Sequence, residues 1–219
     1  KGLELELGMI RRMSGKIGAP GGTGRATAAA LVLALAALAA GCGSQDVPTL
    51  MASARADIAK KQGDAARISL KNVLQQEPEH AEARFLLGHL LLESGDAAGA
   101  EVELRRALEK QHPAAKVVPL LATAMLAQNK GPALLQQFGS MRLDDAEADA
   151  RLQSLLATAE AAGDNVAAAI ARVDAVLKAR PDDTPAALLR ARLAAAGGQQ
   201  ADALAQVDKL LARQADNAE

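Results

Sequence analysis

Residues 81–109 read AEARFLLGHLLLESGDAAGAEVELRRALE, two runs of strong helix formers divided by Gly95-Asp96. Pro113 follows the second run. A looser copy of the pattern begins about 34 residues upstream, with Gly63-Asp64 between two apolar runs and Pro78 after them. Helix formers, a glycine turn and a proline thus recur in the same order, which indicates a repeated helical hairpin.

A period of about 34 residues built from paired helices is typical of tetratricopeptide repeats (TPR). One hairpin cannot bury its apolar face alone, so neighbouring hairpins stack into a solenoid whose function lies on an extended surface. We therefore expect an all-α, TPR-type α-solenoid of about five helix-turn-helix repeats over residues 48–215. The repeats are expected near residues 48–80, 81–113, 114–145, 146–183 and 184–215.

Composition supports this expectation, because half of the chain is hydrophobic, there is no Trp or Tyr, and Phe is present only twice. Sheet proteins favour aromatic and β-branched residues, whereas alanine and leucine favour helices. We expect Gly95 to be left-handed, Asp96 to cap the helix after it, and Pro119 to lie in a first helical turn. Glycine and proline punctuation predicts helices at 50–61, 65–76, 81–93, 97–110, 115–128, 132–139, 146–162, 165–178, 185–196 and 200–213.

The front of the chain carries a second pattern. A basic stretch without acidic residues precedes an apolar run at 26–40, which ends in small residues before Gly41. This order predicts a secretory signal peptide, so residues 1–41 are read as an N-terminal extension with its signal. The apolar run is shorter than the roughly 20 residues that a membrane-spanning helix needs. Lys1 to Gly8 do not fit a signal peptide, and Met9 or Met13 is the expected start.

The only cysteine of the chain, Cys42, directly follows the expected cleavage site. The arrangement resembles a bacterial lipoprotein signal, although Ala39 stands where leucine is usual. The resemblance implies lipidation of Cys42, a flexible tether at 42–47 and membrane anchoring. Gly43, rather than Asp, implies an outer-membrane location facing the periplasm. An ordinary cleaved signal and an uncleaved anchor remain alternatives.

Charge argues against one class of partner. Residues 42–219 carry 20 basic and 24 acidic residues, a net charge near −4. Nucleic-acid binding needs a basic face, so no nucleic-acid partner is expected.

Several stretches go beyond a general TPR pattern: residues 81–109, LKNVLQ at 70–75, VVPLLA at 117–122 and LAQ at 126–128. Together they resemble the TPR-repeat lipoprotein of the PEP-CTERM/exosortase system (PrsT-type), which accompanies exopolysaccharide gene clusters. The resemblance implies a lipid-anchored, non-catalytic scaffold in the bacterial envelope that assists protein sorting and exopolysaccharide-linked surface assembly. Members of that family are usually longer than this chain.

The sequence contains no convincing catalytic or metal-binding motif. The segment APGGTG at 19–24 lacks the lysine and the Ser/Thr of a phosphate-binding loop. His80, His89 and His112 have no metal-ligand spacing, and Cys42 has no partner base nearby in sequence. We therefore expect neither enzymatic activity nor a cofactor or metal. A hidden hydrolase using His89 or His112 is the rival reading.

A TPR solenoid binds an extended peptide or a partner's helix through polar side chains on the first helix of each hairpin. Five residues are candidates for this groove: Arg55, Arg84, Lys116, Arg151 and Arg190. An assembly lipoprotein of another envelope machine, serving pilus biogenesis, polymer export or outer-membrane protein insertion, would have a similar sequence.

The last expected helix presents apolar residues without a polar capping helix after it. Solenoids need such caps for solubility, so we expect either self-association through this end or fraying of residues 200–219. The apolar residues concerned are Leu204, Val207, Leu210 and Leu211.

Overall fold

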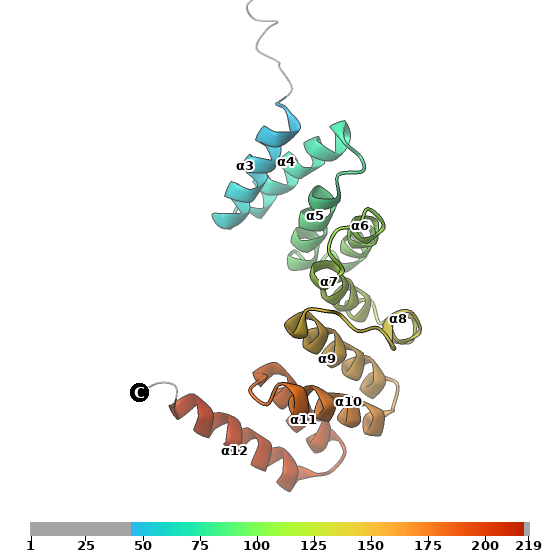
Figure 1. Ribbon diagram of the computed structural model, residues 1–219, viewed down its shortest axis with the longest axis vertical. Helices are drawn as coiled ribbons and strands as arrows, with labels where there is room; N and C mark the ends of the chain where they lie inside the picture. Colours follow the sequence, from blue (N-terminus) through green and yellow to red (C-terminus); the bar gives the residue numbers. More distant parts are fainter. Residues whose placement is uncertain (1–44, 217–219) are drawn as a thin grey trace, which may run out of the picture. The chain divides into compact units, whose positions relative to one another are not determined.

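The computed structural model describes residues 45–216, and this part of the chain is helical, without a strand (Figure 1). Every predicted helix is present, and its ends lie within three residues of the predicted ends. The all-α expectation is therefore confirmed. The helices are α3 (Val47–Ala59), α4 (Gly63–Gln76), α5 (Ala81–Glu93), α6 (Ala97–Glu109), α7 (Ala114–Ala127), α8 (Gly131–Phe138), α9 (Ala146–Ala162), α10 (Val166–Ala179), α11 (Thr184–Ala196) and α12 (Gln200–Asp216).

The helices pair into five successive hairpins, and each hairpin packs on the next. Within the pairs, α3 contacts α4, α5 contacts α6, α7 contacts α8, α9 contacts α10, and α11 contacts α12. Between the pairs, the second helix of each hairpin contacts the first helix of the following one. Figure 1 shows these hairpins following one another in chain order. This is the translational order that a solenoid requires, since each unit shelters its neighbour's apolar face.

One left-handed residue stands in the turn of every hairpin. Gly95 has φ +84°, and the Asp96 Oδ1 atom accepts a hydrogen bond of 2.8 Å from Gly99 N, so both expectations for this turn are confirmed. The equivalent position falls on Lys61, Asn129, Asp164 and Gly198, all with φ between +57° and +78°. These five turn residues are about one TPR period apart, with a single extra position before Asp164; Gln111, at φ +62°, is also left-handed but lies between the second and third hairpins. The backbone turn therefore repeats more regularly than the residue type that occupies it.

The first turn differs from the prediction. Gly63 is the first residue of α4 rather than part of the turn, and Lys61 takes the left-handed conformation. The hairpin geometry places the turn one full repeat before Gly95, and the glycine happens to lie just after that point. The glycine therefore predicted where the turn lies, but not which residue takes the left-handed conformation.

Small residues let the helices of a hairpin approach closely. A Cβ atom added to Gly88 on α5 would lie 2.8 Å from the Leu104 Cγ atom and 3.3 Å from the Ala100 carbonyl oxygen on α6. Buried alanines occupy the position equivalent to Ala100 in other second helices, at Ala66 and Ala169. The close α5–α6 approach expected from the sequence is therefore present, with Leu104 rather than Ala107 against the glycine.

The third hairpin is irregular. α8 has only eight residues, and an irregular connection through residues 139–145 replaces the rest of a full second helix. α7 consequently contacts α9 directly and carries much of the largest apolar cluster, which includes Met125. Pro119 is the sixth residue of α7, buried in the helix interior rather than in its first turn. Its ring has no N–H to donate to the Ala115 carbonyl.

Several expectations lie outside the described residues. These are the signal peptide at 1–41, the lipidation of Cys42 and residues 42–44, the first half of the tether at 42–47. The last residue of that tether, Val47, begins α3, and Asp46 caps it by accepting a 3.0 Å hydrogen bond from Thr49 N.

Candidate functional site

The first helices of the hairpins form a continuous row, because α5 contacts α7, α7 contacts α9, and α9 contacts α11. Polar side chains recur along this row at the repeat spacing. Glu82, Lys116 and Arg151 are equivalent positions in successive repeats, and Arg55 and Arg192 belong to a second such series. We call the surface that carries these five residues the first-helix face.

A cavity of about 620 Å³ lies on the first-helix face between α9 and α11. Leu155 and Leu189 give it an apolar part, while Ser154 and Thr158 add hydroxyl groups. The cavity therefore offers both apolar contact and hydrogen-bonding groups along neighbouring helices. Its other lining residues are Glu147, Arg151, Arg180, Asp182, Asp183, Thr184, Pro185 and Arg192.

Two arginines at this cavity have no partner among the described residues. Arg151 on α9 and Arg192 on α11 are both exposed, and neither donates a hydrogen bond or forms an ion pair within the described part of the chain. Arg180, in contrast, pairs with Asp183 at 3.3 Å. The free guanidinium groups are available to carboxylates of a partner, which they can bind in a bidentate manner.

The predicted groove residue Arg55 lies on the first-helix face but is engaged. Its Nη2 atom lies 2.7 Å from the Glu82 Oε2 atom, which joins α3 to α5. The hydrogen bond from Arg55 holds the pKa of Glu82 below its usual range. About half of the Arg55 side chain is exposed, so the pair can exchange with a ligand's charges. Lys116 is exposed on α7 without a partner in the described part.

Two other predicted groove residues are held inside the repeats. Arg84 is buried and donates from Nε and Nη2 to the Pro78 carbonyl at 3.0 and 2.7 Å, and from Nη1 to the Glu103 carboxylate at 2.5 Å. Its guanidinium group therefore ties α5 to α6 and to the preceding loop. With these bonds made inside the fold, the structure keeps Arg84 away from the first-helix face.

Arg190 plays a similar structural part in the last two hairpins. Its side chain is only 12% exposed, and it bridges Asp174 on α10 at 2.8 Å and Asp202 on α12 at 3.1 Å. Arg190 thus joins three helices. The arginine that reaches the cavity is Arg192, two positions later, which the sequence reasoning did not select.

An aromatic stack near the second hairpin was also missed. The rings of Phe85 on α5 and His112, just before α7, lie 4.4 Å apart between centroids, and His89 lies 6.4 Å from Phe85. Burial lowers the pKa of His112, and the positive charge of Lys116 lowers it further. The His112 Nε2 atom is buried without a hydrogen-bond partner. The scarcity of aromatic residues was the signal that could have drawn attention to this position.

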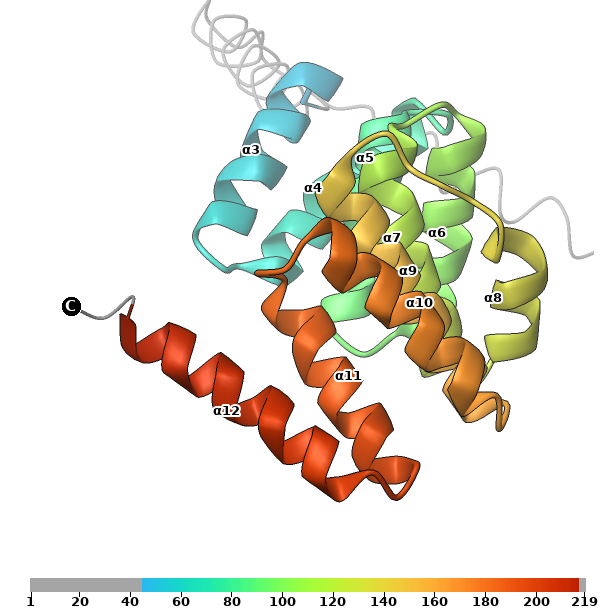
Figure 2. The same ribbon diagram turned by 60° about the horizontal axis from the view of Figure 1, so that its bottom comes forward.

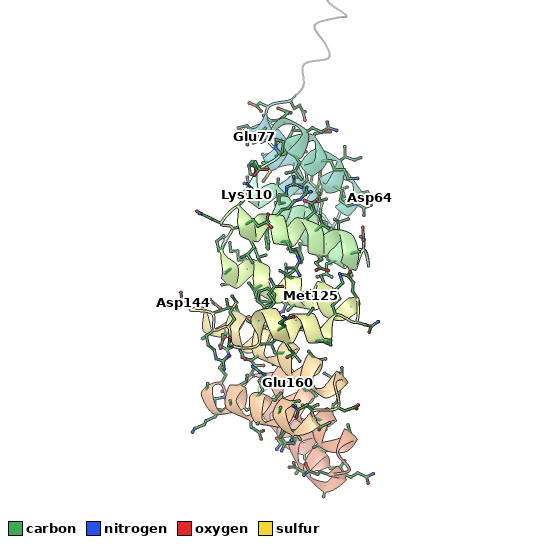
Figure 3. The ribbon with its side chains drawn as sticks, turned by 90° about the vertical axis from the view of Figure 1, so that its right-hand side faces the viewer. Asp64, Glu77, Lys110, Met125, Asp144 and Glu160 are labelled. Atoms are coloured by element: carbon green, nitrogen blue, oxygen red, sulfur yellow. The ribbon has the colours of Figure 1, made fainter. Side chains whose placement is uncertain are left out.

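A larger cavity, about 750 Å³, lies beside the irregular connection at 139–145 and is lined mainly by α9 and α10. Arg172 on α10 binds Glu160 at 2.6 Å, the Gln153 side chain at 2.7 Å and the Gly139 carbonyl at 3.3 Å. Figure 3 shows Glu160 among the helices, whereas Asp144 lies at the edge. This network holds the irregular connection in place where helix packing is missing. Its polar groups are therefore already engaged within the fold.

A buried carboxylate joins the second and third hairpins. Glu101 on α6 accepts hydrogen bonds from Lys130 at 2.7 Å, Gln128 at 2.8 Å and Arg105 at 2.9 Å. Burial raises the pKa of Glu101, but these donors outweigh burial and lower the pKa overall. These hydrogen bonds tie α6 to the turn of the third hairpin.

Metal-ligating side chains do not gather anywhere in residues 45–216. In the same range, none of the helices combines the length and apolarity that crossing a bilayer requires.

Comparison with known proteins agrees with this geometry. The tetratricopeptide repeat family model matches residues 57–122, which span α4 to α6 and parts of the flanking helices. The crystal structure of MamA covers 78% of this chain and 93% of its own, with a TM-score of 0.63 and 18% identity. The fold is a TPR-type solenoid. The expected fold class is therefore confirmed, although at this identity the likeness to MamA concerns the fold alone.

Two further solved structures have a similar fold and similar scores. Pseudomonas aeruginosa PilF covers 75% of this chain and 75% of its own, with a TM-score of 0.63 and 17% identity. YrrB, described as a TPR protein with an unusual peptide-binding site, covers 80% and 95%, with a TM-score of 0.57 and 15% identity. No curated protein matches the sequence significantly. The TPR fold is thus established by its neighbours, and it is a scaffold suited to protein–protein interaction.

Proposed function

We propose that this TPR chain is a non-catalytic interaction scaffold that binds an extended, acidic segment of a partner protein on its first-helix face. The observation that carries the proposal is the pair of free arginines, Arg151 and Arg192, at the cavity between α9 and α11. Carboxylates of the partner bind these guanidinium groups, and an apolar partner residue packs on Leu155 and Leu189. Lys116 and the exchangeable Arg55–Glu82 pair extend the same surface toward the first hairpin.

The binding surface is tested by selecting peptides from a random display library against the whole chain. Enriched peptides are expected to combine acidic residues with an apolar one. Arg151→Ala and Arg192→Ala should each weaken their binding about tenfold, because a charge-assisted hydrogen bond contributes about 1.5 kcal/mol or more. Lys71→Ala, which removes an exposed cation on α4 away from the cavity, should leave binding unchanged. Selected peptides that bind both arginine variants as tightly as the original chain would refute the proposal.

The scaffold is further proposed to be a lipoprotein of the bacterial envelope, anchored through Cys42 to the outer membrane and facing the periplasm. Support comes from the basic stretch, the apolar run at 26–40 and the cysteine that follows them. Several acyl chains on one cysteine hold a protein stably at a membrane. Mass spectrometry of the membrane fraction should find mature protein that begins at acylated Cys42. Mature protein that begins elsewhere with an unmodified Cys42 would contradict this anchor.

Within the envelope, the proposed role is to assist PEP-CTERM/exosortase protein sorting and exopolysaccharide-linked surface assembly. The support is the resemblance of residues 81–109 and 117–122 to the TPR lipoprotein of that system. An exosortase gene beside the coding gene would favour this role. A neighbourhood of pilus, polymer-export or outer-membrane insertion genes would instead favour the alternative of an assembly lipoprotein in another envelope machine.

A further inference from the structure

The outer face of α12 has the same apolar pattern as the other second helices. Those helices are packed against the first helix of the following hairpin, whereas this face of α12 is exposed. Leu74, Leu108, Leu177 and Leu211 are equivalent positions of α4, α6, α10 and α12 in the repeat register. The first three are partly buried against clusters that include residues of the following first helix. Leu211, in contrast, is 59% exposed.

A second position shows the same contrast. Ile170 on α10 packs against the cluster that contains Ala186 and Leu193 of α11. Its equivalent on α12, one repeat later, is Leu204, which is 65% exposed. Leu204 and Leu211 are separated by about two helical turns and therefore project from the same side of α12. Figure 2 shows α12 at one end of the stack, beside α11.

The same end of the stack also carries a hollow. A cavity of about 490 Å³ lies between α11 and α12, with a floor of small residues at Ala191, Ala195 and Ala203. Leu204 lines this hollow and also protrudes beside it. A protruding leucine and an alanine-floored hollow on one surface make that surface self-complementary, which is the condition for a two-fold interface.

The first helix of another copy, α3, is the obvious alternative cover, but its side chains are too small. The α5 residues that share an apolar cluster with α4 include Ala83, Leu86, Leu87 and Leu90. Their equivalents in α3 are Thr49, Ala52, Ser53 and Ala56. A head-to-tail stack would therefore set Leu204 and Leu211 against a flat, half-polar face, with poor interdigitation.

We propose that two copies of this chain pair through α12, antiparallel about a two-fold axis, with Leu204 of each copy opposite Leu211 of the other. Successive helices in the array run in opposite directions (Figure 1), so an antiparallel second α12 reproduces the covering that α10 receives from α11. In this register, Leu211 of each copy lies opposite Leu204 of its partner, at the level of the partner's alanine-floored hollow. The interface closes on itself and stops at two copies. It uses the end of the stack, and Arg192 lines both this hollow and the cavity of the proposed peptide-binding surface, so the disrupting variants below change residues of α12 only.

Sedimentation equilibrium of the full chain carrying Cys42→Ser tests the pairing. A reversible dimer is expected. Leu204→Glu and Leu211→Glu should each raise the dimer dissociation constant by roughly 100-fold or more, because each removes two buried leucines per dimer. Val102→Glu is the matched control, since Val102 is 48% exposed on the second helix α6, and it should leave the constant unchanged. Circular dichroism checks that all three variants keep their helices.

Disulfide crosslinking then tests the register. In the Cys42→Ser chain, an equimolar mixture of Leu204→Cys and Leu211→Cys should oxidise to a crosslinked dimer far more than either variant alone. A chain that stays monomeric, a series of growing oligomers, or equal crosslinking of Leu204→Cys with itself would each overturn the proposal.

Discussion

The guanidinium group of Arg172 on α10 holds both carboxylate oxygens of Glu160 on α9, with Nε 3.1 and 3.0 Å from them and Nη2 2.6 Å from Oε1. Both side chains are less than one-fifth exposed. The pair sits where the short α8 leaves α9 and α10 without a full neighbouring helix. An ion pair and its hydrogen bonds therefore replace apolar packing at this point of the array.

Glu160→Gln should destabilise the chain by about 3 kcal/mol, because it leaves the Arg172 charge largely buried without its counter-ion. Urea unfolding followed by circular dichroism measures the change. Glu147→Gln, an exposed change on the same helix, is the control and should be nearly neutral. The double variant Glu160→Gln/Arg172→Gln should lose less unfolding free energy than the two single variants lose together, since no buried charge remains. Strict additivity would show that the two groups do not interact.

Gly88→Ala should destabilise the chain by about 1–3 kcal/mol through overpacking. The new Cβ atom would lie 2.8 Å from the Leu104 Cγ atom and force α5 and α6 apart. Gly63→Ala is the matched control, because its Cβ atom would meet only the Leu90 Cδ2 atom, at 3.8 Å. Thermal unfolding of the two variants should therefore move in different directions or by clearly different amounts. Equal midpoints would argue against close α5–α6 packing.

The stability of the chain should fall as the pH drops below about 6.5, the ordinary pKa of histidine. In the folded state, burial and Lys116 lower the pKa of His112, while Glu82 opposes them. The unfolded chain therefore takes up the proton first, and the folded state loses stability until the pH passes the lowered pKa. His112→Phe keeps the stack on Phe85 and should flatten the decline between about pH 7 and pH 5.5. A variant whose urea midpoint declines as steeply as the original would disprove this assignment.

Lys61→Gly should stabilise the chain by about 0.5–1 kcal/mol, because glycine removes the steric cost of a side chain in the left-handed region. Lys61 has φ +60° at the position that Gly95 occupies in the next hairpin. Lys60→Gly is the neighbouring control with φ −86°, and there glycine only adds freedom to the unfolded chain, so a loss of stability is expected. Chemical denaturation of both variants decides whether the conformation at Lys61 is strained.

The helices were predictable because leucine and alanine spacing, glycine turns and capping residues agree in most units. Asp96 illustrates this agreement, since its sequence position alone predicted the cap that the structure contains. Lys61 and Asp164 illustrate the limit. Their left-handed backbone follows from the hairpin register and not from residue type, so local propensity pointed to the neighbouring glycines.

The groove residues were harder to predict, because first helices have neighbours on several sides. Arg84 and Arg192 both lie on first helices, yet one is buried between α5 and α6 while the other lines the cavity. The direction in which each side chain points depends on how its helix packs against neighbouring helices. A single sequence does not specify that packing. The Phe85–His112 stack was missed for a related reason, because it joins residues far apart in sequence across a hairpin.

The spacing of the left-handed residues has an evolutionary consequence. The turns keep a constant phase except for one extra position between Asn129 and Asp164, the interval that holds the irregular connection at 139–145. An insertion within a helix would rotate every later side chain by about 100° around its axis and misdirect the apolar stripe. Loop residues absorb the same insertion without that rotation. Changes in length among descendants of this chain should therefore accumulate in the third unit, while the other four remain fixed in size.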